Sequence, residues 1–345
     1  MKSLITVLFL FAFAGEASSA YRIGLAVDSS SNMLMRPDGE AGTYTYLFGD
    51  AIHSFGKAGF SYGFGGGVLE HYEGVQFHSH TVDISYEVVS KKNFSLDTTI
   101  EGGFSRYGDV TILNGYNYFN LSSGIKTYLT PTTLLRWGGN IGRRSYKIYN
   151  LESYIEADTY LRIDRFFQSG TTLRGQIDVG THRYYEESNK PSNSLLDFSV
   201  RVARSVSQQW GIWLEAQQSS LVNPSKYEDT TQINDSFFLD DQYKYSKTGF
   251  VLSSKHLFDR PGSIQFRTSY SKKTYGSSQT SLYWYLPPEG WTEREWRMYL
   301  TLNYRFEFLP SLLHPSYEIY YIKVDASEPD LSYVSTGITL RFELF

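Results

Sequence analysis

The chain has 345 residues, with 32 lysines and arginines against 36 aspartates and glutamates, so its formal net charge at pH 7 is −4. This near balance gives no reason to expect nucleic acid as a partner. The absence of cysteine excludes a disulfide framework. Hydrophobic residues make up 41% and aromatic residues 17% of the chain, with 29 tyrosines and 23 phenylalanines, a composition that favours many half-apolar strands over one buried core.

Residues 1–20, with the sequence MKSLITVLFLFAFAGEASSA, have the features of a secretory signal peptide. Lys2 precedes an apolar run, and Ser18 and Ala20 are small residues placed as in a cleavage site. We therefore expect an exported protein whose mature chain, residues 21–345, begins near Tyr21 and forms one domain. Beyond the signal no apolar run approaches the roughly 20 residues that a membrane helix needs, so we do not expect an inner-membrane protein.

Strand-like alternation starts with the mature chain, because Tyr21, Ile23 and Leu25 share one face of an extended segment. From there, short connections rich in the residues of tight turns alternate with longer polar ones. The expected short connections are residues 53–59, 90–93, 130–132, 165–170, 206–209, 258–262 and 309–315. The expected long ones are residues 28–42, 67–75, 106–117, 147–153, 183–194, 220–245, 273–292 and 325–332. They separate about sixteen strands, within a range of roughly 14 to 18, and place both termini on the short-turn side.

The individual strands predict a barrel that spans a membrane. In residues 152–164, for example, Ile155, Leu161 and Ile163 fall on one face, and charged or tyrosine residues fall on the other. Since a bilayer tolerates neither open sheet edges nor unpaired backbone groups, exported strands of this kind imply closure. The expected fold class is all-β, a transmembrane antiparallel up-and-down β-barrel. A secreted β-sandwich or propeller is the alternative, but the regular alternation of connection lengths and the lack of a fixed-length repeat count against it.

Charged residues on the expected inward faces of the central strands are the candidate functional residues, because a charge there needs water or an opposite charge. Two interpretations are open: a water-filled lumen with both signs on its wall, or a salt-bridged lumen that is shut. The acidic segment 220–245, which includes Asp240 and Asp241, is either a cation-favouring mouth or a solvated loop. The candidate lumen charges are Arg136, Arg143, Glu156, Asp158, Arg162, Arg174, Asp178, Arg201 and Glu215, with Asp164 and Asp197 on the same faces.

Histidines are the residues to consider for metal or catalytic chemistry. His71, His78 and His80 surround one expected external loop, but the last two continue the outward phase of the strand that follows, so we expect contact with lipid headgroups and no metal site. His53 is followed directly by Ser54, which places the two on opposite strand faces and not in a catalytic pair. We therefore expect no enzyme activity, no catalytic or metal-binding residues and no cofactor.

The last stretch, residues 333–345, alternates between an apolar and a polar face. Bacterial outer-membrane β-barrels end in a pattern of one polar residue, one glycine and two hydrophobic residues at fixed places, filled here by Ser335, Gly337, Leu340 and Phe342, with Phe345 as a terminal aromatic. On these residues the chain resembles bacterial outer-membrane β-barrel proteins of the porin-like class. The resemblance implies an outer-membrane location, contact with outer-membrane lipid, recognition by the barrel-assembly machinery and closure of the last strand on the first.

The expected function is that of a passive, porin-like diffusion channel for small polar solutes. The alternative is a non-conducting barrel that anchors an export or surface-assembly complex, and a lipid-modifying enzyme is a weaker third hypothesis. A homo-oligomer is a further expectation, since trimers are common among porin-like barrels. The segment 106–117 is too short to be the long inward-folded loop of general porins, so no particular porin family is indicated.

Overall fold

The computed structural model of the chain describes residues 17–31, 41–69, 75–91, 94–107, 115–146, 153–184, 193–222, 245–259, 262–276, 290–304, 313–327 and 332–344. These residues form sixteen β-strands. Among them, no helix has the length and apolar character needed to cross a membrane. Most of the expected signal peptide, residues 1–16, and the terminal Phe345 lie outside the described residues.

The strands range from 12 residues in β3 and β16 to 17 residues in β4. The first eight are β1 (Ala17–Ser30), β2 (Gly42–Phe55), β3 (Ala58–Leu69), β4 (Val75–Lys91), β5 (Phe94–Tyr107), β6 (Tyr116–Thr130), β7 (Thr133–Tyr146) and β8 (Tyr154–Phe166). The second eight are β9 (Thr171–Tyr184), β10 (Asn193–Ser205), β11 (Trp210–Val222), β12 (Tyr245–Leu257), β13 (Gly262–Tyr275), β14 (Thr292–Tyr304), β15 (Leu313–Ala326) and β16 (Tyr333–Leu344). All exceed the roughly 9 to 11 residues with which a tilted strand crosses a bilayer, so their ends extend past the hydrocarbon layer.

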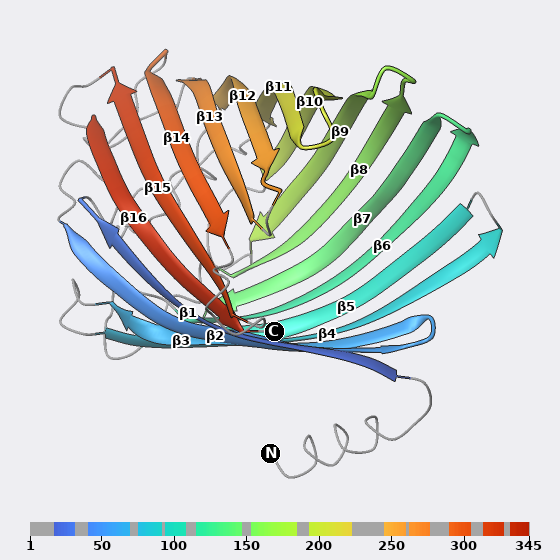
Figure 1. Cartoon of the computed structure of the whole chain (residues 1–345), viewed down its shortest axis with the longest axis horizontal. Helices are drawn as coiled ribbons and strands as arrows, with labels where there is room; N and C mark the ends of the chain where they lie inside the picture. The colour runs from blue at the N-terminus through green and yellow to red at the C-terminus, as the bar shows by residue number, and fades with distance from the viewer. Residues whose placement is uncertain are drawn as a thin grey trace, which may run out of the picture.

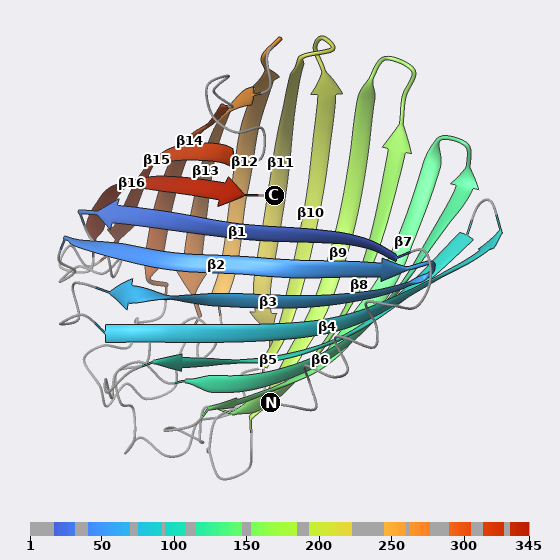
Figure 2. The ribbon, with the colours of Figure 1, turned by 60° about the horizontal axis from the view of Figure 1, so that its bottom comes forward.

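Each strand pairs antiparallel with its neighbours in the sequence, and β16 pairs with β1 to close the barrel (Figure 1). Figure 2 shows β1 lying between β16 and β2 along the closing seam. The register of the seam joins Ile23 to Leu344 and Ser30 to Gly337. The expected fold class, the strand number and the closure of the last strand on the first are therefore confirmed.

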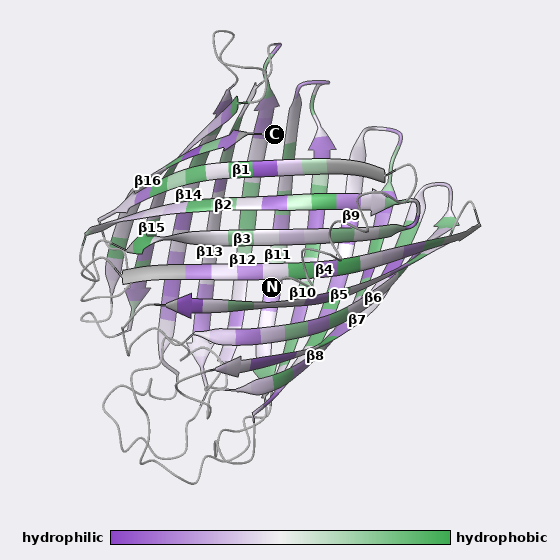
Figure 3. Ribbon diagram, turned by 90° about the horizontal axis from the view of Figure 1, so that it is seen from below, coloured by the Kyte–Doolittle hydropathy of each residue, from purple (hydrophilic) through white to green (hydrophobic). Residues whose placement is uncertain are grey.

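Each strand has one side that faces outward and one that faces the lumen. In β8, Leu161 and Ile163 are 42% and 43% exposed, whereas the side chains of Arg162 and Asp164 between and beside them are 19% and 1% exposed. Side chains diverge on the convex side of a curved sheet and converge on the concave side, so the exposed apolar set is the outer one. Hydrophobic and hydrophilic residues alternate in this way along the strands in Figure 3, giving an apolar outer surface and a polar lumen wall.

The connections at one end of the barrel are short. Gly56 and Lys57 join β2 to β3, with Gly56 at a φ of 61°, and Gly170, at a φ of 75°, precedes β9. Glycine adopts a positive φ without the steric cost of a Cβ. The two ends of the described chain lie at this end too, because Ala17 pairs with Phe55 beside the first turn and Leu344 pairs with Leu313 at the start of β15.

Two expected short connections are wrong in their bounds. Residues 53–59 include strand residues at both ends, because β2 continues to Phe55 and β3 begins at Ala58. Residues 309–315 are wrong at their end. Strand β15 already begins at Leu313, and Pro315 pairs with Phe342 within the sheet. A proline is tolerated there because it lies close to the start of the strand, where fewer ladder hydrogen bonds depend on its missing N–H.

At the closing seam two glycines lie under aromatic rings. Gly337 of β16 is opposite Tyr320 of β15, and a Cβ at Gly337 would lie 2.3 Å from that ring. The Tyr320 side chain crosses β16, and its hydroxyl donates to Asp28 of β1 at 3.4 Å. Gly24 of β1 is covered by Phe48 of β2 in the same way. An aromatic ring over a cross-strand glycine fixes the register of a curved sheet, so these pairs hold the seam together.

Gly337→Val is therefore expected to impair assembly of the barrel. The branched side chain would displace the Tyr320 ring and break its contact with Asp28, with a loss of about 1 to 3 kcal/mol in the free energy of unfolding. The measurement is urea unfolding, together with the yield of the gel band that shifts on heating. Gly175→Val is the matched control, because a Cβ at Gly175 of β9 meets no atom within 4 Å. Equal stability and yield of the two variants would contradict the prediction.

Candidate functional site: the charged lumen wall

The structure places most of the charges predicted for the lumen on its inner wall. They lie on β7 to β11 in the phase opposite to the exposed apolar side chains: Arg136, Glu156, Asp158, Arg162, Arg174, Asp178, Arg201 and Glu215. Asp164 and Asp197 share this side. Asp240 and Asp241 lie outside the described residues. The role of these charges in selecting solutes stays a prediction.

Arg143 is the exception, and its expected place on the lumen wall is wrong. It shares the phase of Trp137 and Ile141, which are 54% and 61% exposed on the outer face. Its neighbour Arg144 faces the lumen instead, with its guanidinium 4.8 Å from the centre of the Tyr116 ring. The two adjacent arginines therefore divide between the two faces of β7.

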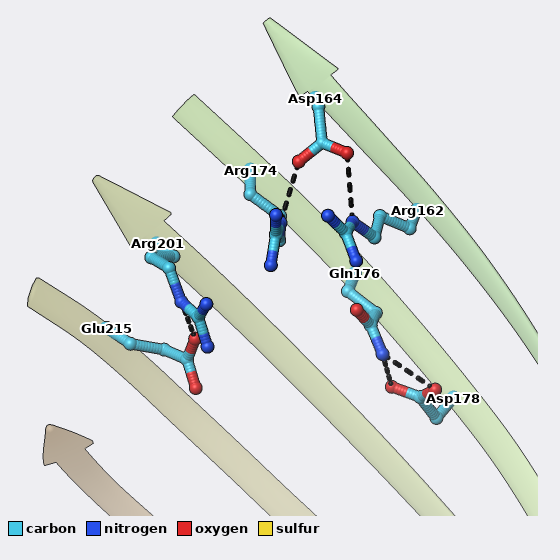
Figure 4. A network of polar contacts seen from close by, with 7 residues as sticks. All are labelled: Arg162, Asp164, Arg174, Gln176, Asp178, Arg201 and Glu215. Carbon is cyan, nitrogen blue, oxygen red and sulfur yellow. Dashed lines mark hydrogen bonds and ion pairs between the residues drawn. The ribbon is translucent and has the colours of Figure 1, made fainter. Parts of the chain in front are cut away.

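A bridge of three charged residues joins β8 to β9 (Figure 4). Asp164 accepts hydrogen bonds from the Nε of Arg162 at 2.9 Å and from the Nε of Arg174 at 2.6 Å. The Asp164 side chain is buried, whereas the two arginine side chains are 19% and 24% exposed. The paired carboxylate satisfies its own hydrogen bonding and holds two guanidiniums on the wall, each with further N–H donors.

A second ion pair joins β10 to β11, where the Nε of Arg201 donates to Glu215 at 2.5 Å (Figure 4). The Arg201 guanidinium also lies 4.4 Å from the centre of the inward Trp213 ring, and Arg267 of β13 lies 5.9 Å from the same ring. Cation–π contacts of this kind orient an arginine without neutralising it. Trp213 therefore helps to hold two positive charges at the wall.

The ion pairs of the described strands run along the wall and not across the lumen. Each joins residues of a single strand or of two hydrogen-bonded strands, from Arg22 with Asp50 on β1 and β2 to Arg297 with Glu295 on β14. Within the part of the chain that the structure describes, no ion pair connects opposite walls. A lumen shut by salt bridges therefore has no support in these strands.

Charges of one sign gather in two sectors of the wall. The inward charges described on β4 and β5 are acidic, whereas those on β12 and β13 are basic. In the closed order of sixteen strands these two strand pairs are half a turn apart, so they face each other across the lumen. The acidic sector consists of Asp83, Glu87, Asp97 and Glu101, and the basic sector consists of Lys247, Lys255, Arg267 and Lys273.

Three charges near the middle of these sectors, Asp83, Glu101 and Arg267, have no ion-pair partner among the described residues. Ser61 donates a hydrogen bond to Asp83, and Tyr118 donates one to Glu101 at 2.7 Å, but no lysine or arginine among the described residues forms an ion pair with either carboxylate. Arg267 likewise has no carboxylate within ion-pair distance in the described strands. Charges that lack an opposite partner require water, so both sectors indicate a hydrated lumen.

An aromatic recess, which the sequence reasoning missed, lies on the lumen side of the first strands. Tyr44 and Tyr46 stack with ring centres 4.9 Å apart, and Arg22 and Arg341 lie 5.8 and 5.4 Å from the centre of the Phe48 ring. Arg22 and the three aromatic residues help to line a recess of about 510 Å³. In the sequence, the signal for this recess is that Tyr44, Tyr46 and Phe48 alternate with smaller or aliphatic residues, which face outward.

The described histidines of the candidate metal cluster face outward, as expected. The Nδ1 of His80 is 2.7 Å from the Tyr62 hydroxyl, and the rings of His78 and His80 both contact Phe104. Among the described residues no group of three histidines or acidic residues is placed to hold a metal ion. His71 lies outside the described residues.

Asp164→Asn is expected to lower the free energy of unfolding by about 1 to 3 kcal/mol, because it leaves Arg162 and Arg174 without their shared carboxylate. The loss is smaller than for a fully buried pair, since both guanidiniums are partly solvated. Asp178→Asn is the matched control on β9, because its hydrogen-bond partner is the Gln176 amide at 2.9 Å. Urea unfolding in lipid vesicles measures both; coincident transitions would show that the bridge adds no stability.

No protein-family model and no curated protein matches the chain. Solved structures do match it. OccD3 (OpdP) of Pseudomonas aeruginosa has a TM-score of 0.55 at 10% identity, covering 95% of this chain and 91% of that one. OprD of the same organism has a TM-score of 0.54 at 12% identity over 95% of both chains, and a bacterial polysaccharide outer membrane secretin has 0.54 at 9% identity over 94% of this chain and 97% of that one. The chain is therefore a closed sixteen-stranded antiparallel β-barrel with the fold of OprD-like porins.

Proposed function

We propose that the protein is a passive diffusion channel of the outer membrane for small polar solutes. The observation that carries this proposal is the lumen wall, where an acidic sector on β4 and β5 faces a basic sector on β12 and β13, and Asp83, Glu101 and Arg267 within them need water. A barrel of sixteen strands is wide enough for an aqueous interior. The OprD and Occ neighbours are outer-membrane porins, which supports the same function.

The outer surface supports the location. Its exposed apolar side chains suit a lipid environment, and short turns beside both chain ends are typical of the periplasmic side of such barrels. The long connections then lie outside the cell. We infer export by the signal peptide of residues 1–20 and recognition of β16 by the barrel-assembly machinery, through Ser335, Gly337, Leu340, Phe342 and Phe345.

The alternative of a non-conducting anchor for an export or surface-assembly complex is less well supported, although one structural neighbour is a polysaccharide outer membrane secretin. A dry lumen filled by ion pairs would suit an anchor. In the described strands the ion pairs stay at the wall, and the opposed sectors hold charges that need hydration. The channel is therefore favoured, and no step of the proposed function is catalytic.

The opposed sectors also indicate which solutes pass most readily. Asp83 and Glu101 pair near the middle of β4 and β5, and Arg267 lies near the middle of β13. Fixed charges of opposite sign on facing walls create a field across the lumen, which the low-dielectric wall focuses. A small zwitterion lowers its energy in this field by turning its ammonium group toward β4 and β5. We propose that zwitterions pass more readily than neutral solutes of the same size.

The purified protein is expected to give ion-conducting steps in a planar bilayer. Asp83→Asn combined with Glu101→Gln removes negative charge from the wall and shifts the reversal potential toward anions, whereas Arg267→Gln shifts it toward cations. Both shifts fade at high salt, because the Debye length falls from about 10 Å at 0.1 M to about 3 Å at 1 M. Correctly folded barrels that never conduct at any voltage would refute the channel.

The preference for zwitterions is testable with glycine and glycolamide, which have the same atoms but only one of which carries opposite charges. In a liposome-swelling assay we expect glycine to enter about 2- to 5-fold faster through the wild-type barrel. Arg267→Gln should bring the ratio of the two rates close to one. Arg165→Gln, which removes a positive charge from the outward face of β8, is the matched control and should leave the ratio unchanged. An unaltered ratio in Arg267→Gln would count against selection by the field.

A further inference from the structure

Charged residues on the outward face of the barrel are mostly basic, and they play no part in the proposed passage of solutes through the lumen. On the outward side of the described strands Asp325 is the one acidic residue. Basic residues, in contrast, collect outward near the strand ends that lead into the long connections. We call the following six the outer basic rim: Arg106, Arg143, Arg183, Lys272, Arg294 and Lys323. The opposite end of the strands has Arg165 and Arg204 outward.

Lys272 and Arg294 form the centre of the rim. They are register partners on β13 and β14, and both are exposed. Like charges directly opposite each other in a sheet repel. Asp325 is the register partner of Arg294 on β15, but its carboxylate is bonded to Lys323 at 2.9 Å. In the described strands neither Lys272 nor Arg294 forms an ion pair, so an anion held between them would relieve the repulsion.

Aromatic side chains fix the depth of this pair in the membrane. Tyr270 and Trp296, each two residues closer to the middle of the strand on the same face, have ring centres 4.5 Å apart. Phe250 of β12 packs against both rings. Tryptophan and tyrosine gather at the level of the lipid headgroups. The basic pair just beyond them therefore lies where lipid phosphates lie.

A similar arrangement recurs on β5. The Arg106 guanidinium lies 5.1 Å from the centre of the Phe104 ring, and its Nη1 donates to the backbone carbonyl of Tyr116 at 2.8 Å. His80 packs against the same Phe104 ring at 4.9 Å. A guanidinium held by a ring and a carbonyl keeps other N–H groups ready for a phosphate oxygen. Exposed Arg183 on β9 continues the rim along the same side of the barrel.

We propose that the outer basic rim binds the phosphate groups of a phosphorylated saccharolipid in the outer leaflet. A lipid is favoured over soluble phosphate because its acyl chains already contact the apolar surface below the rim, which brings its phosphates to the height set by the aromatic residues. The inference rests on the outer-membrane placement given under the proposed function. It does not depend on conduction through the lumen.

Binding of diphosphoryl lipid A to the full barrel in detergent, with divalent cations chelated, tests the proposal. Lys272→Gln combined with Arg294→Gln should weaken binding about 30-fold, because each basic side chain beside an anionic lipid surface contributes about 5-fold. Arg165→Gln combined with Arg204→Gln removes the same charge at the opposite end and should leave affinity within about 2-fold of wild type. Lipid A without phosphate should bind the wild-type barrel weakly. Its affinity should match that of diphosphoryl lipid A for the Lys272→Gln, Arg294→Gln variant.

The proposal is overturned if the Lys272→Gln, Arg294→Gln variant binds diphosphoryl lipid A as tightly as the wild type does, or if the Arg165→Gln, Arg204→Gln control loses as much affinity. It is also overturned if millimolar inorganic phosphate competes fully, because that result would indicate a site for free phosphate. The heat shift in gel mobility verifies that each variant is folded. Planar-bilayer recordings separate the two proposals. Conducting barrels that do not bind lipid phosphate contradict the rim alone, and barrels that bind it but do not conduct contradict the channel alone.

Discussion

A strand in hydrocarbon finds no water for its N–H and C=O groups, so a sheet in the membrane must have no open edge. In this chain the requirement is met where β16 pairs with both β15 and β1. Side chains fasten the same seam, since Tyr320 reaches across Gly337 to Asp28 and the buried hydroxyls of Ser30 and Ser335 lie 3.0 Å apart. The inside and the outside of the barrel exist only because this seam closes.

Closure of the barrel also places the alternating side chains of each strand on either the lumen wall or the lipid-facing surface, so the charged residues gather on the lumen wall. A slip of one residue in any pairing would exchange the two faces of a strand, moving Asp164 or Glu215 into lipid. With the register held, inward arginines meet carboxylates of their own or a neighbouring strand, as Arg201 meets Glu215, or lie against aromatic rings, as Arg144 lies against Tyr116. The acidic and basic sectors face each other only in the closed barrel, because their relative position depends on how many strands separate β4 from β12.

Features that depend on residues close together in the sequence could be predicted from it, whereas features that depend on contacts between distant strands could not. Strand positions, their number and the apolar face of β16 depend on period-two alternation and turn residues, which are local in the sequence. The bridge from Arg174 to Asp164 depends on cross-strand register, and the facing sectors depend on closure. Neither is readable from one strand. Arg143 was misplaced for a different reason: β7 holds two adjacent arginines, and only the spacing of Trp137 and Ile141 decides which one faces the lumen.

The sorting of acidic residues suggests a better sequence rule for barrels of this kind. In the placement proposed for this barrel, outward residues near the strand ends that lead into the long connections lie close to lipid phosphates, which repel a carboxylate and attract an ammonium or guanidinium group. Acidic residues in a strand therefore mark the inward phase, with Asp325 of β15 as the exception in the described strands, whereas basic residues are compatible with both faces. On β8 the acids Glu156, Asp158 and Asp164 identify the lumen side without reference to any apolar residue. Strand β7 contains no acidic residue, so charge alone could not assign its two arginines, and the error occurred where this signal is missing.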